Sequence, residues 1–109
     1  MTLTDIRDLL LTITTNVYHY KAWEQPSSYI VWAEDGQGAS SHSDNRMQLQ
    51  AIQGTIDYYT KIEFDPVFDL IQKKLNTIDL SWMLNSIQNE EDTGYTHYEW
   101  AWEVENSIG

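Results

Sequence analysis

The stretch LSWMLNSIQNEEDTGYTHYEWAWEV, residues 80–104, indicates the fold class of this chain. Two segments rich in apolar and aromatic residues, 80–88 and 95–104, flank a polar turn in which Gly94 can adopt a left-handed conformation. The second segment alternates, with Tyr98, Trp100, Trp102 and Val104 on one face and His97, Glu99, Ala101 and Glu103 on the other. We therefore predict an antiparallel hairpin with one face against a hydrophobic core.

Two amphipathic helices are predicted before this hairpin. In the stretch FDPVFDLIQKKLN, residues 64–76, Asp65 is a good N-cap, Pro66 suits the first helical position and Asn76 is a plausible end. Near the N-terminus, Thr2 and Asp5 can form a capping box. The apolar residues that follow recur at helical spacing: Ile6, Leu9, Leu10 and Ile13.

Three further strands are predicted at residues 17–23, 29–33 and 47–61. In the last of these, the apolar phase slips at Ile52 beside Gly54, which suggests a β-bulge. The element order is then α-β-β-β-α-β-β. We expect a single α+β domain spanning residues 1–109, with a mainly antiparallel sheet and two helices packed on one face.

Composition narrows the function classes. Six basic and seventeen acidic residues give a net charge of −11, which disfavours direct nucleic-acid binding. The chain has no cysteine, and no apolar stretch approaches the roughly 20 residues that a membrane span needs. We therefore expect no membrane partner and no thiol chemistry.

No motif predicts catalysis, a cofactor or a metal. Ser41, His42, Ser43 and Asp44 are adjacent in sequence, whereas a catalytic triad is recognised by side-chain geometry. The three histidines lie on different predicted elements, and no His-x-x-x-His spacing occurs. We expect no catalytic, cofactor-binding or metal-binding residues and no enzyme activity.

Some strands are apolar on both faces. Ile30 and Trp32 oppose Tyr29, Val31 and Ala33, and Met83 and Ile87 oppose Leu80, Trp82 and Leu84. Two helices cover one sheet face, so the other face needs a cover. Either the sheet curls and covers itself, or the chain associates with itself or with a partner.

The order of elements resembles the tail-terminator, or tail-completion, proteins of long-tailed bacteriophages and of prophages. The resemblance runs from about residue 4 to residue 105, through YIVWAEDG, LQAIQGTIDYYTK, FDPVFDLIQKKLN and SWMLNSIQNEEDTGYTHYEWAWEVE. It implies a structural protein of the neck of the virion, assembled in the host cytoplasm without a cofactor. Its partners would be itself, as a hexameric ring, the tail tube protein and the head connector. DNA would pass through this ring without being bound.

The resemblance also implies that the segment 34–46 is a loop that is mobile in the monomer and ordered in the ring. We expect contacts with partners from this loop and from the tip of the last hairpin. The candidate interface residues are Glu34, Asp35, Gly36, Gly38, His42, Asp44, Arg46, Glu90, Glu91 and Asp92. Alternatives are another neck or head-completion protein of the same fold, an acidic DNA-mimic inhibitor, or a small enzyme or ligand-binding domain.

Overall fold

The computed structural model of the chain describes residues 1–38 and 49–107. Its elements are α1 (Leu3–Leu11), β1 (Val17–His19), β2 (Ser28–Gln37), β3 (Leu49–Thr60), α2 (Val67–Leu75), β4 (Ser81–Asn89) and β5 (Thr96–Ser107). The five strands form one sheet in the order β1-β2-β3-β5-β4. All neighbours are antiparallel except the short parallel pair β1 and β2. The predicted α+β class and the order α-β-β-β-α-β-β are confirmed.

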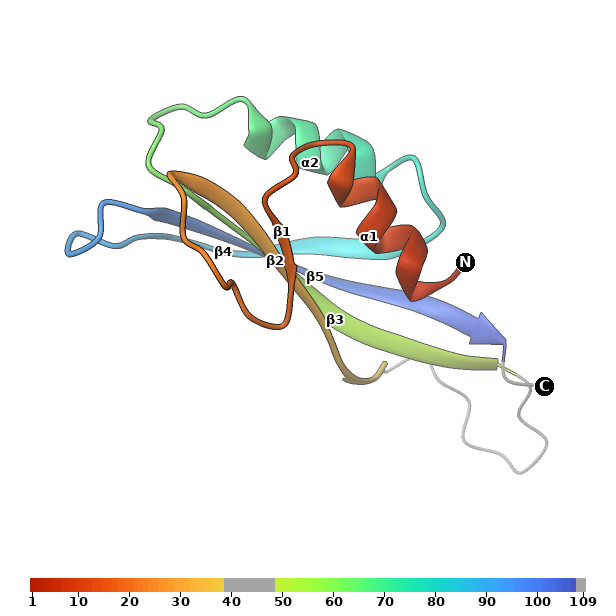
Figure 1. Cartoon of the computed structure of the whole chain (residues 1–109). Helices are drawn as coiled ribbons and strands as arrows, with labels where there is room; N and C mark the ends of the chain where they lie inside the picture. Colours follow the sequence, from red (N-terminus) through yellow and green to blue (C-terminus); the bar gives the residue numbers. More distant parts are fainter. Residues whose placement is uncertain (39–48, 108–109) are drawn as a thin grey trace.

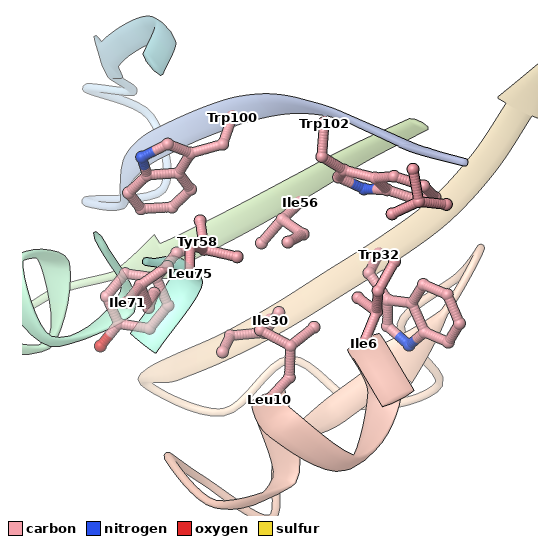
Figure 2. Close-up of a cluster of buried hydrophobic side chains, with 11 residues drawn as sticks. Ile6, Leu10, Ile30, Trp32, Ile56, Tyr58, Ile71, Leu75, Trp100 and Trp102 are labelled. Atoms are coloured by element: carbon pink, nitrogen blue, oxygen red, sulfur yellow. The ribbon is translucent and has the colours of Figure 1, made fainter. Parts of the chain in front are cut away.

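Both helices lie over the same face of the sheet (Figure 1), and one hydrophobic core lies between the two layers. Figure 2 shows Ile6 and Leu10 of α1 and Ile71 of α2 directed at the strands of the sheet. Trp100 and Trp102 of β5 are almost completely buried in this core. The apolar face predicted for the last strand is therefore the face that meets the helices, because alternate residues of a strand share one side.

The local signals at the helix ends are confirmed except at the start of α2, where Pro66, and not the predicted Asp65, is the N-cap residue. The Asp5 carboxylate accepts a hydrogen bond from the Thr2 backbone N–H at 2.8 Å, as a capping box requires. The Asp65 carboxylate accepts one from the Val67 N–H at 2.9 Å at the start of α2. Asn76 is the C-cap of α2.

The predicted strand 17–23 is wrong beyond His19. Tyr20 has a φ of 69°, and the Lys21 N–H donates to the His19 carbonyl at 2.9 Å. This three-residue turn reverses the chain and ends β1. The imidazole of His19 stacks between the rings of Tyr20 and Trp32, at centroid distances of 4.2 and 4.1 Å. Aromatic stacking therefore holds a turn that strand propensity alone does not predict.

The predicted bulge lies in the neighbouring strand. Pairing between β3 and β5 is continuous, whereas the register between β2 and β3 shifts between Glu34 and Gly36. Gly54 has a different role, because a Cβ there would lie 2.0 Å from the Ala33 carbonyl oxygen and 2.4 Å from the ring of Trp102. The absence of a side chain at Gly54 lets the ring of Trp102 pack directly against the backbone of β3.

A second irregularity, between Leu84 and Ser86, corrects the predicted faces of β4. Met83 pairs with Ala101, on the face away from the helices, and so opposes Trp82 and Leu84 as predicted. After the shift Ile87 pairs with Tyr98, on the helix side, so Ile87 does not share the face of Met83. An extra residue in a strand reverses the alternation beyond it, which explains the error.

Candidate functional site

The predicted interface loop is partly strand. Glu34, Asp35 and Gly36 belong to β2, and the Gly38 N–H continues the pairing by donating to the Ala51 carbonyl at 2.8 Å. The expectation of a loop beginning at residue 34 is therefore wrong for 34–37. The strand continues through polar residues because its hydrogen-bonding partner β3 is long enough to extend the ladder.

Three of the predicted interface residues, His42, Asp44 and Arg46, lie outside the described residues. The expectation of a mobile arm therefore stays a prediction for the rest of the segment.

Glu34 has a structural contact. Its carboxylate lies 2.5 Å from Nε2 of His19 and also bonds the Tyr20 hydroxyl. Partial burial acts to raise the pKa of Glu34, but these hydrogen bonds outweigh it and the pKa is lowered. Glu34 therefore helps to hold the turn after β1 against β2. The neighbouring Asp35 accepts a longer bond from Nε2 of Gln53, at 3.4 Å.

The second group of predicted residues does form the hairpin tip. Gly94 has the expected positive φ of 79°, and its N–H donates to the Glu90 carbonyl at 2.9 Å. Glu90 is partly buried and accepts from the Thr93 hydroxyl at 3.1 Å, whereas Glu91 and Asp92 are exposed. Only the latter two side chains are fully available to a partner.

The two predicted groups lie towards opposite ends of the sheet. Glu34 pairs with Gly54, and the hairpin strands end at Thr96, which pairs with Thr60. Gly54 and Thr60 are six residue steps apart in β3, which is roughly 20 Å along an extended strand. They therefore do not form one site.

Part of the face opposite the helices is covered by the chain itself. Tyr29, Tyr59 and Tyr95 form an aromatic cluster there, and Tyr29 and Tyr95 are buried. The Tyr95 hydroxyl donates to the carbonyl oxygens of Gln25 and Pro26, at 3.0 and 2.7 Å. The connection between β1 and β2 therefore covers the second apolar face of β2. At this part of the sheet the chain covers its own apolar face, which is the first of the two alternatives given by the sequence.

The middle of this open face holds a charged cluster that sequence patterns did not predict. Nε2 of His97 on β5 lies 2.7 Å from Oδ1 of Asp57 on β3, and both side chains are 16% exposed. The pKa of His97 is raised, first by this hydrogen bond, against the opposing effect of burial. Glu99 lies beside them, and its carboxylate accepts from Nδ2 of Asn85 at 2.6 Å.

The ring of His97 is also fixed in place. It stacks on Tyr59 with a centroid distance of 4.2 Å. The signal that could have revealed this cluster is the alternation of His97 and Glu99 on one face of β5. Asp57 is 40 residues away in sequence, and only the register of β3 against β5 brings it into contact.

Next to this cluster the open face is hollowed into a groove of about 320 Å³. Asp35, Thr55, Met83, Ala101 and Glu103 are among its lining residues. Thr55 and Ala101 are paired one step along the same face from Asp57 and Glu99. Met83, which is 61% exposed, is the large apolar side chain at its rim.

Several other large apolar side chains are exposed, most of them in the connections between elements. Phe64, just before α2, is 92% exposed and has a φ of 53°. Trp23, in the connection between β1 and β2, is 79% exposed and lies under the ammonium of Lys21, 5.3 Å from the ring centroid. Ile62 and Ile87 are more than half exposed. Sequence patterns did not select Phe64, because nothing in FDPVF distinguishes an exposed phenylalanine from a buried one.

Within the described residues, no helix is both long and apolar enough to cross a membrane. Neither a scan against protein-family models nor a search of curated protein sequences finds a match for this chain.

Proposed function

We propose that this chain is a structural subunit of a bacteriophage neck, a tail terminator whose ring caps the tail tube and joins it to the head connector. The proposal combines the whole-chain resemblance with one structural observation, the presentation of Phe64. Phe64 is 92% exposed, so in the isolated chain its phenyl ring contributes almost no burial of apolar surface to stability. A protein partner that covers the ring would bury this apolar surface and thereby stabilise the complex.

The backbone at Phe64 strengthens this argument. A φ of 53° places a bulky residue in the left-handed region, at a cost of about 1 kcal/mol or more. Such strain persists where the surrounding structure fixes it, and it is concentrated at functional positions. The adjacent Asp65 is fixed by hydrogen bonds to Tyr58, Thr60 and Val67. The loop is therefore rigid enough to present the ring to a neighbour.

Subunits of a ring contact each other through two different surfaces, because a head-to-tail interface is not self-complementary. This chain offers two. One is the loop that carries Ile62 and Phe64. The other is β4, an edge strand of the sheet from which Met83 projects. We propose that the loop of one copy contacts the β4 side of the next.

The negative charge fits a channel for DNA. With a net charge of −11, a ring would repel the phosphate backbone and let it pass. The proposed partners are other copies of the chain, the tail tube protein and the head connector. No cofactor takes part, and the site of action is the head–tail interface of the virion.

The test is to measure the native mass of the chain over increasing concentration, alone, with tail tube protein and with head connector protein, and to image the products by electron microscopy. We expect rings, and we expect Phe64→Ser to weaken them. Leu11→Ser is the matched control, because Leu11 is also an exposed apolar residue, at 45%, but lies in α1. A chain that remains monomeric with and without the tube would refute the proposal. Rings that bind the connector but not the tube would instead indicate another neck or head-completion protein.

A further inference from the structure

The cluster Asp57, His97 and Glu99 places two carboxylates beside a single imidazole. Asp57 and Glu99 are directly opposite each other on adjacent strands. Like charges at such positions destabilise a sheet. Within the described residues, no Lys or Arg forms an ion pair with either carboxylate. His97 reaches Asp57, while Glu99 receives a neutral donor, the amide of Asn85.

We propose that these three side chains bind a divalent transition-metal ion of the zinc class, contrary to the expectation from sequence. One ligand atom from each residue lies within 4.8 Å of the other two. Ligands about 2.1 Å from a tetrahedral ion are roughly 3.4 Å apart, so small side-chain movements would bring the three atoms to it. Two carboxylates also balance the charge of a dication.

The types of ligand select the class of ion. An imidazole nitrogen favours zinc and its neighbours in the first transition series, whereas Mg²⁺ and Ca²⁺ prefer oxygen ligands alone. Three protein ligands leave a fourth position for water. The ion would bind the ring nitrogen that now contacts Asp57, and that contact would be replaced by coordination.

The surroundings hold the ligands in place. β3 and β5 are neighbouring interior strands of the sheet, and their pairing is unbroken. The ring of Tyr59 stacks on His97, and the Asn85 amide donates to one oxygen of Glu99. Among the described residues, none donates a hydrogen bond to the other Glu99 oxygen, so that oxygen can coordinate. Contacts of this kind orient ligands in metal sites.

The experiment is calorimetric titration of zinc chloride into tag-free, EDTA-treated protein in excess Mg²⁺. We expect one strong site, and at least about 100-fold weaker binding in His97→Gln, because even indirect supporting contacts change affinity by 10- to 100-fold. The matched control is His19→Gln, since His19 also contacts a carboxylate, Glu34, but belongs to no such group of three among the described residues. The control should bind zinc like the unchanged protein.

A second variant and a second method keep the test decisive. Glu99→Gln should also lose zinc affinity, and circular dichroism shows whether each variant folds. In the unchanged protein, traces of Mn²⁺ should first broaden the NMR amide signals of residues 57, 97 and 99. The proposal is overturned if Mg²⁺ abolishes zinc binding, if His97→Gln folds and retains it, or if the broadening centres on the acidic hairpin tip.

Discussion

Replacing Asp65 with alanine should be one of the most destabilising single changes in this chain. Asp65 is 6% exposed, and its carboxylate accepts three hydrogen bonds. Oδ2 accepts from the Tyr58 hydroxyl at 2.5 Å and from the Thr60 hydroxyl at 2.7 Å. Oδ1 accepts from the Val67 N–H at 2.9 Å. One side chain thus joins the end of β3 to the start of α2.

The expected loss of stability follows from the hydrogen-bond donors that alanine would leave without an acceptor. The donors Tyr58 and Thr60 are 2% and 0% exposed, so water does not readily replace the lost acceptor. Each buried donor without a partner costs about 1–3 kcal/mol, and loss of the helix cap costs about 1 kcal/mol. Allowing for the coupling between these bonds, we expect a loss of about 4 kcal/mol in the free energy of unfolding. A domain of this size has about 5–15 kcal/mol in total.

Urea unfolding, followed by tryptophan fluorescence, measures this loss. Asp69→Ala is the matched control, because Asp69 is an exposed acid in the first turn of the same helix and should contribute less than about 1 kcal/mol. Asp65→Asn, which keeps one acceptor oxygen, should fall between the two. If Asp65→Ala costs no more than Asp69→Ala, the three hydrogen bonds do not stabilise the fold as argued.

Three other changes test separate features. Gly54→Ala should cost about 3 kcal/mol, because its Cβ would collide with a backbone oxygen, whereas Gly36→Ala, with no atom within 4 Å, should cost less than about 1 kcal/mol in the same urea assay. The pKa of Tyr58 is raised to about 12 by burial and by its bond to Asp65, so the stability that its protonated hydroxyl provides is complete below the ordinary value of 10.0 and is lost as pH rises towards 12. Tyr58→Phe should reduce this alkaline loss in urea midpoints without abolishing it, because burial also raises the pKa of Tyr59 to about 12. Phe64→Asn should raise the free energy of unfolding by up to about 1 kcal/mol, because asparagine tolerates a left-handed backbone, and an unchanged or lower value would remove the argument from strain.

The parts of the fold that sequence predicts are those where local and tertiary preferences agree. The capping box at Thr2 and Asp5, the hydrogen bond from the Val67 N–H to Asp65 and the alternation of β5 each specify structure without knowledge of distant residues. The errors occur where a distant contact decides. β1 ends early because Tyr20 and His19 stack towards Trp32, thirteen residues beyond His19.

The candidate site shows the same limit more strongly. Glu34 and Asp35 look like loop residues because they are polar, yet the partner strand draws them into β2. His97 and Glu99 are visible as an alternating pair, but the register of β3 decides that Asp57, and not Thr55, completes the group. Periodicity assigns faces to strands, whereas a site across strands requires the pairing.

If Phe64 has the proposed role in assembly, stability and function oppose each other in the adjacent residues Phe64 and Asp65. The hydrogen bonds of Asp65 stabilise the segment that includes the preceding residue, Phe64. They offset the cost of the left-handed backbone at Phe64, whose ring lies in solvent. If the ring had no partner, an asparagine at position 64 would be more favourable, because it tolerates the left-handed backbone and exposes no apolar ring. A Phe64→Asn variant that gains stability while losing assembly would separate the two roles, because in the proposed ring the contact with another subunit offsets the cost of this conformation.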